Sequence, residues 1–267
     1  MTRVFLGFSG VLTAAILFVA AAPAAVTAPP SGITLQTAAG YPMQYYVSLP
    51  HGWAKGKRWP VVVIIENATK EWQDITRVFA DARGDRPFIL VTPLILTNGG
   101  HDHRHMPVYH YPDSTWDRVD RVGTCAFDLD GVTAVMADVT RRYGGEDRCF
   151  LTGWEAGGHL VFATLFRHPE RLRAVAPNAP NYIGRCMDDV KFSVAKERSD
   201  LPIRVFYGTA DSAASAPNGV LRRQWLTVEA LAKSHGYLRT SEAALPGRGH
   251  DAFAAEILAY FGSFLAP

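Results

Sequence analysis

Runs of apolar, β-branched residues alternate with amphipathic stretches along this chain, and the alternation predicts strands and helices in turn. The run from Pro60 to Ile65 is continuously apolar, which is typical of a central strand buried on both faces of a sheet. Further strands are expected at 33–36, 44–49, 88–92, 149–152, 173–176, 203–207 and 240–245, and helices at 71–82, 128–143, 156–167, 220–235 and 251–264. The pattern predicts an α/β fold, a mostly parallel central sheet with helices on both faces.

The longest stretch without a predicted helix or strand runs from 94 to 127. It is too long for a plain connection and follows a strand end, which is where binding loops occur. Ligands of such folds bind beyond the carboxyl ends of the strands. We therefore expect this stretch to form a roof over the functional site.

The amino terminus has a different pattern. Met1-Thr2-Arg3 precedes a largely apolar stretch at 4–20 and then Ala22-Pro23-Ala24, the arrangement of a secretory signal cleaved after Ala24. A transmembrane anchor is the alternative, although about 17 apolar residues is at the short limit for a span. We expect a signal at 1–24, a single domain over 25–267, a secreted or periplasmic location and no stable membrane span after cleavage.

Composition narrows the classes of partner. The chain is 48% hydrophobic and 19% charged, which is ordinary for a globular protein. Loss of Arg3 with the signal leaves 26 of the 27 Lys and Arg residues against 25 Asp and Glu, a balance that gives no sign of a nucleic-acid surface. We expect a monomer without a nucleic-acid partner.

The three cysteines permit one disulfide in an exported chain. Cys125 lies in the expected roof and Cys186 follows the strand at 173–176, so both belong at the carboxyl end of the sheet. Cys149 begins its strand at the opposite end. We expect a Cys125–Cys186 bridge and a buried Cys149, while another pairing or three reduced thiols remains open.

One motif joins the strand at 149–152 to the helix that follows. In Gly153-Trp154-Glu155-Ala156-Gly157, two glycines four positions apart flank a central side chain, as a strained strand-to-helix turn requires. Downstream, Asp211 follows the strand at 203–207 and His250 precedes the last helix. The order of central residue, acid and histidine is that of the α/β hydrolases.

These motifs resemble the α/β-hydrolase superfamily over roughly residues 40–265. The stretch 128–144, the turn and the stretch 166–177 look most like secreted polyhydroxybutyrate-depolymerase and feruloyl-esterase-like proteins. The resemblance implies an α/β-hydrolase fold, a small-molecule or polymeric ester-like ligand and no cofactor. It places Glu155, Asp211 and His250 at the catalytic positions, with Glu155 where the family has its nucleophile serine, and it implies oxyanion contacts from the backbone amides of Ala156 and Ala68.

Two departures from the family argue against serine-type chemistry. Glu66-Asn67-Ala68 stands where relatives carry His-Gly, so a carboxylate lies close to where negative charge would develop. If Glu155 attacked an ester carbonyl, the resulting intermediate would expel the carboxylate more readily than an alkoxide, and the reaction would run backwards.

The residues leave two other interpretations of Glu155 open. A carboxylate can attack saturated carbon, as the aspartate of epoxide hydrolases in this superfamily does, with His250 then activating water. Alternatively, hydrolysis has been lost and a Glu155–His250 ion pair fills the old site.

The expected roof is rich in histidine and aromatic residues. His101, His103, His105 and His110 could converge on zinc or copper, or they could belong to a solvated polar loop, so no metal is assigned. Tyr109, Tyr111, Trp116 and Trp154 offer flat faces for an aromatic or sugar-like ligand. The same rings could instead pack the roof against the domain.

Overall fold

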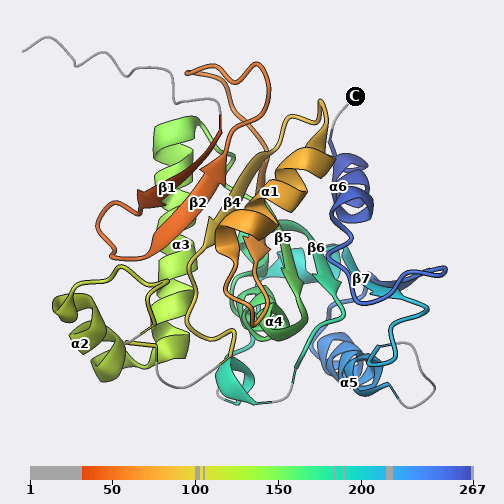
Figure 1. The fold of residues 1–267 in the computed structure, drawn as a ribbon. Helices are drawn as coiled ribbons and strands as arrows, with labels where there is room; N and C mark the ends of the chain where they lie inside the picture. Colours follow the sequence, from red (N-terminus) through yellow and green to blue (C-terminus); the bar gives the residue numbers. More distant parts are fainter. Residues whose placement is uncertain are drawn as a thin grey trace, which may run out of the picture. The chain divides into compact units, whose positions relative to one another are not determined.

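The computed structural model describes residues 32–99, 103–104, 106–182, 184–188, 190–214 and 219–265, and the signal predicted at 1–24 lies outside them. Eight strands form one sheet in the order β1-β2-β4-β3-β5-β6-β7-β8 (Figure 1). The strands are β1 Ile33–Thr37, β2 Gln44–Ser48, β3 Val61–Ile65, β4 Ile89–Pro93, β5 Cys149–Trp154, β6 Leu172–Asn178, β7 Ile203–Gly208 and β8 Thr240–Leu245. β2 pairs antiparallel with β1 and with β4, and the other pairs are parallel, so the predicted mostly parallel sheet is confirmed.

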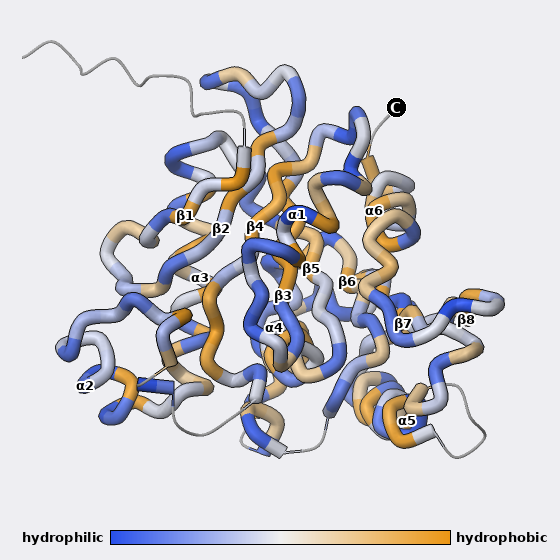
Figure 2. Tube along the Cα trace, viewed as in Figure 1, coloured by the Kyte–Doolittle hydropathy of each residue, from blue (hydrophilic) through white to orange (hydrophobic). Residues whose placement is uncertain are grey.

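Helices cover both faces of this sheet. The helices are α1 Trp72–Arg83, α2 Asp113–Val122, α3 Thr124–Tyr143, α4 Gly158–Arg167, α5 Val220–Ser234 and α6 Ala254–Gly262. Within β3, Val62 and Ile64 pack into one apolar cluster with α1 and α6, whereas Val63 and Ile65 pack into the other with α3, α4 and α5. Figure 2 shows apolar residues concentrated on the central strands. No helix in the described part of the chain is long and apolar enough to cross a membrane.

The predicted roof differs from the structure in its second half. The expectation of a loop over 94–127 is wrong there, because α2 forms and α3 begins at Thr124 rather than at 128. Only Thr115, Trp116 and Val119 of α2 are buried, so its apolar periodicity is too short to stand out in a polar stretch. Gly123 closes α2 through a hydrogen bond from its backbone N–H to the Val119 carbonyl oxygen.

A disulfide joins Cys125 in the first turn of α3 to Cys186 in the short 3₁₀ helix η3 Arg185–Met187, as predicted from the layout. It ties α3 to the segment that follows β6. Cys149 is a free, buried thiol, and its burial raises its pKa to about 12. A thiol that stays protonated in a packed core is an inert, structural residue.

Candidate functional site

The predicted site residues lie at the end of the sheet where the parallel strands terminate, because each follows the carboxyl end of a strand. Glu66 comes directly after β3 and Glu155 directly after β5. Asp211 and His250 lie in the loops after β7 and β8. The fold thus places these four side chains at the carboxyl end of the sheet, although they are far apart in the sequence.

Glu155 occupies a strained turn between β5 and the helix pair η1 Glu155–Gly157 and α4. Its φ is +45°, in the left-handed region that L-residues rarely adopt, while Trp154 before it is extended. A Cβ on Gly157 would lie 2.6 Å from the Ile65 carbonyl oxygen, and one on Gly153 would lie 2.5 Å from a methyl group of Val161. The turn therefore requires glycine on both sides of Glu155, which is the physical reason for the spacing in the sequence.

The Glu155 side chain is held by a residue that the sequence did not single out. Asn181, which follows β6, donates a hydrogen bond from Nδ2 to Glu155 Oε1 at 3.1 Å. The backbone N–H of Asn181 also donates to the Glu155 carbonyl oxygen at 2.9 Å. In the described part of the chain, no ion pair or hydrogen bond joins Glu155 to His250. The ion pair considered above is therefore not formed, and Ala156, buried at 4% exposure, continues the turn.

Asp211 and His250 form a close pair. Asp211 Oδ2 lies 2.7 Å from His250 Nδ1, and the Asp211 side chain is 4% exposed against 38% for His250. The other Asp211 oxygen accepts the backbone N–H of Ala213 at 2.9 Å. A carboxylate on Nδ1 fixes the imidazole with Nε2 facing outward as the acceptor nitrogen. The pair retains the geometry of an oriented general base.

The loop after β3 is built around a buried carboxylate. Glu66 is 1% exposed and accepts hydrogen bonds from the Thr69 hydroxyl at 2.8 Å and from the Lys70 backbone N–H at 2.9 Å. Asn98 Nδ2 donates to the same side chain at 3.2 Å. The Thr69 backbone N–H instead donates to Asn67 Oδ1 at 2.9 Å, and Ala68 lies exposed on the same loop. The predicted oxyanion contact from this side is thus opposed by a buried acidic side chain that already takes up two donors of the loop.

A second buried acid holds the start of the roof. Asp128 in α3 is fully buried and accepts the backbone N–H groups of Leu96 at 2.8 Å and Thr97 at 2.7 Å. Lys70, with a left-handed φ of +62°, donates from Nζ to Asn98 Oδ1 at 3.0 Å. Burial lowers the pKa of the Lys70 amine. A buried polar network therefore links the loop after β3 to the roof.

Burial raises the pKa of Glu66 from 4.5 to about 7, against the opposing effect of its hydrogen bonds from Thr69 and Lys70. The folded chain then holds a proton that the unfolded chain has released at mildly acidic pH. Protons bound in excess by the folded state make the free energy of unfolding fall as pH rises, here from about 4.5 to about 7. We expect chemical denaturation across this window to show that fall.

Glu66→Gln should reduce this slope, because the amide has no proton to release, whereas Asp128, whose pKa burial raises to about 7, still contributes to it. Asp85→Asn, a change at an exposed acid next to the end of α1, should leave the slope as in the wild type. Equal slopes for wild type and Glu66→Gln would mean that Glu66 does not hold its proton in the fold.

The roof aromatics pack inward. Tyr109, Tyr111 and Trp116 are 5%, 9% and 4% exposed, and their rings contact one another at centroid distances of 5.7 to 5.9 Å. Tyr109 also donates its hydroxyl to the Ile95 carbonyl oxygen at 2.7 Å. These three rings hold the roof down, the second of the two roles considered for them, and do not present a free face to a ligand.

The roof histidines are only partly described. His101 and His105 lie outside the described residues, His103 is buried with its ring 5.8 Å from that of Tyr109, and His110 is exposed. Among the described residues, no group of three His, Cys, Asp or Glu side chains is arranged to hold a metal ion.

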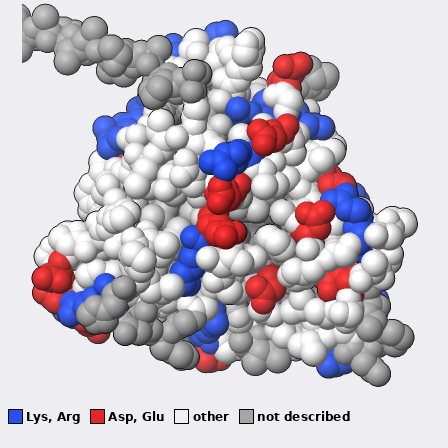
Figure 3. All heavy atoms as spheres, viewed as in Figure 1, with Lys and Arg blue, Asp and Glu red and all other residues white. Residues whose placement is uncertain are grey.

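A pocket of about 220 Å³ borders the Asp211–His250 pair. Trp154 and His250 line it, with ring centroids 5.3 Å apart, together with four carboxylates of Glu66, Glu71, Asp74 and Asp251. On the face seen in Figure 3, acidic and basic side chains are interspersed among larger uncharged areas. Of the four aromatics predicted to bind a ligand, Trp154 is the one that borders this pocket.

The strand order, the turn at Glu155 and the loops carrying Asp211 and His250 define an α/β-hydrolase fold. Solved structures share it: a siderophore hydrolase, EstB, from Aspergillus nidulans has a TM-score of 0.57 at 18% identity, over 91% of this chain and 97% of that one. Poly(aspartic acid) hydrolase-1 from Sphingomonas sp. KT-1 has a TM-score of 0.58 at 13% identity, over 87% and 97%. An S-formylglutathione hydrolase from Agrobacterium tumefaciens has 0.53 at 15%, over 88% and 95%. No family model and no curated protein matches the sequence, so the likeness establishes the fold alone.

Proposed function

We propose that this chain is an exported protein of esterase or depolymerase lineage that has lost serine-type ester hydrolysis and binds a small carbohydrate-like or aromatic ligand. The observation that carries the proposal is the Glu66 carboxylate, which takes up the Lys70 backbone N–H and the Thr69 hydroxyl of its loop. A developing oxyanion would meet this buried side chain there instead of those two donors, and loss of one oxyanion donor alone costs about 100-fold or more in rate.

Glu155 supports the same conclusion from the other side of the site. Its carboxylate is hydrogen-bonded to Asn181 and makes no hydrogen bond or ion pair with His250 in the described part of the chain. A carboxylate that attacked an ester carbonyl would also be the better leaving group of the intermediate. We therefore infer that the site has no productive nucleophile for esters, while Glu66 takes up two donors of the loop after β3.

The pocket beside His250 suits a hydroxylated ligand. Carboxylates of Glu71, Asp74 and Asp251 accept hydrogen bonds from hydroxyl groups, and the flat face of Trp154 packs on an aromatic ring or on the apolar face of a sugar. Its volume of about 220 Å³ suits one small ring system rather than a polymer segment.

Export is supported by two features. The charged, apolar and small-residue succession of residues 1–24 matches a secretory signal. The Cys125–Cys186 disulfide fits an oxidising compartment outside the cytosol. We place the mature chain in the periplasm or the medium.

We expect methyl and phenyl glycosides to raise the melting temperature of the mature chain without being consumed. Trp154→Ala should weaken binding about tenfold, because it removes the ring contact with the ligand. Trp53→Ala is the matched control: this indole donates to the Tyr143 carbonyl oxygen at 2.9 Å and does not line the pocket, so its loss should leave ligand affinity unchanged.

Two results would contradict this account. A glycoside-induced shift that is equal in wild type and Trp154→Ala, or no shift at all, would exclude the pocket as the ligand site. Turnover of a short ester or an epoxide by the wild type that is lost in Glu155→Gln would identify Glu155 as a catalytic residue and overturn the loss of hydrolysis.

A further inference from the structure

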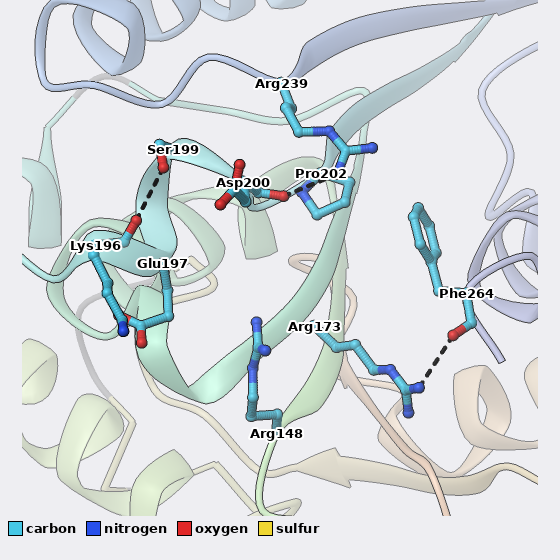
Figure 4. A pocket seen from close by; sticks show the side chains of 9 residues that line it. All are labelled: Arg148, Arg173, Lys196, Glu197, Ser199, Asp200, Pro202, Arg239 and Phe264. Atoms are coloured by element: carbon cyan, nitrogen blue, oxygen red, sulfur yellow. Dashed lines mark hydrogen bonds between the residues drawn. The ribbon is translucent and has the colours of Figure 1, made fainter. Parts of the chain in front are cut away.

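A second hollow lies at the amino-terminal end of the sheet, where parallel strands β5 to β8 begin (Figure 4). Its volume is about 530 Å³, in the range of small-molecule sites. Arg148 directly precedes β5, Arg173 is the second residue of β6, and Arg239 directly precedes β8. Because the strands are parallel, this hollow is separated from Glu155 and His250 by the length of the sheet.

The hollow has an excess of positive charge. Its cationic side chains are Arg148, Arg173, Lys196 and Arg239, and its acidic ones are Glu197 and Asp200 (Figure 4). Arg173 is ion-paired with Glu146 at 2.7 Å. In the described part of the chain, no ion pair joins Arg148, Lys196 or Arg239 to either carboxylate. Three cations therefore remain available to an anionic ligand.

The arginines are held in place while most of their donors stay free. Arg148 donates hydrogen bonds from Nε and Nη2 to the Leu172 carbonyl oxygen, at 2.9 and 2.5 Å. Arg239 donates a hydrogen bond from Nη1 to the Asp200 carbonyl oxygen at 3.1 Å. A guanidinium carries five N–H donors, so each side chain keeps at least three. Contacts to backbone carbonyls orient the groups without neutralising their charge.

Figure 4 shows the guanidinium of Arg148 directed into the hollow from one side and Arg239 entering from the other, with Asp200 and Pro202 between β6 and β7 along the wall. Two oriented guanidinium groups on opposite sides of a hollow match a ligand with more than one anionic group, because each planar fork pairs with one phosphate or carboxylate.

We infer that this hollow is a binding site for a small oligoanion, a ligand that carries two or more phosphate or carboxylate groups. Arg148 and Arg239 bind separate anionic groups, and Lys196 adds an exposed positive charge. The site is independent of the proposed ligand pocket beside His250.

The test is calorimetric titration of the mature chain with inorganic tripolyphosphate and with citrate at low salt. We expect binding that weakens as sodium chloride is added, since exposed charges are screened. The double variant Arg148→Gln with Arg239→Gln should bind at least about tenfold more weakly, because each lost charged hydrogen bond removes a strong contact. Arg77→Gln with Arg121→Gln removes the same charge from α1 and α2 and should bind as the wild type does.

A second variant is expected to bind the anions more tightly than the wild type, so the test does not depend on a loss of affinity alone. Glu197→Gln with Asp200→Asn removes the two carboxylates of the hollow and should tighten binding several-fold. The inference is overturned if neither anion binds, if the Arg148 and Arg239 variant binds as tightly as the control pair, or if removal of the carboxylates weakens binding.

Lipid headgroups also carry phosphate groups. A third experiment therefore distinguishes a soluble anion from a lipid surface. Sedimentation with phosphatidylglycerol vesicles should show no binding beyond that to phosphatidylcholine vesicles. If the chain binds phosphatidylglycerol vesicles but binds neither tripolyphosphate nor citrate, the assignment of a small soluble ligand is overturned.

Discussion

Replacing Gly157 with alanine is expected to destabilise the folded chain by about 3 kcal/mol. The added Cβ would lie 2.6 Å from the Ile65 carbonyl oxygen and 2.7 Å from that of Glu66. Both are backbone atoms at the end of β3, so the overlap is relieved only if the turn and β3 move apart. A loss of this size should lower the melting temperature by about 6–12 °C for a chain of this length.

Gly249→Ala provides the control within the same site. A Cβ on Gly249 would have no atom within 4 Å, and this glycine does not have a left-handed φ. Its replacement should change the free energy of unfolding by less than about 0.5 kcal/mol. Equal melting temperatures for Gly157→Ala and the wild type would mean that the turn at Glu155 does not pack against β3.

Much of the fold follows from patterns within short windows. The apolar run at 60–65 becomes β3 because its alternate side chains fill both apolar clusters. The Cys125–Cys186 bridge followed from the layout of strand ends. In contrast, α2 was missed because its buried residues are few and its remaining side chains are polar, so tertiary contacts rather than periodicity stabilise it.

The site was predicted less completely because its polar contacts join distant segments. Sequence order places Glu66 near the catalytic positions, but its partner Asn98 is 32 residues away, and no motif marks that residue. Asn181 likewise follows β6 without a recognisable pattern. Tyr109, Tyr111 and Trp116 could be ligand contacts or packing residues by type alone, and only their burial decides between the two.

Glu155→Ser is expected to gain esterase activity that the wild type lacks. His250 remains oriented by Asp211 at 2.7 Å, and a histidine base contributes about 100-fold or more to the rate of such reactions. We therefore expect 4-nitrophenyl acetate hydrolysis at least about 100-fold above that of the wild type. The rate should still be slow for an esterase, because Glu66 continues to occupy the loop donors.

Two controls separate this gain from general base hydrolysis on the protein surface. Glu155→Ala removes the carboxylate without adding a hydroxyl and should stay inactive. Glu155→Ser combined with His250→Gln keeps the hydroxyl but removes its base, and should lose the gained activity.

The most direct measurement is the intact mass of the chain after incubation with a fluorophosphonate. We predict one covalent adduct per chain for Glu155→Ser, and none for the wild type or for Glu155→Ser combined with His250→Gln. A folded Glu155→Ser chain that stays unlabelled would contradict the account that the Asp211–His250 pair faces the turn at Glu155. Labelling of the wild type at Glu155 would show a reactive carboxylate there and contradict the loss of hydrolysis.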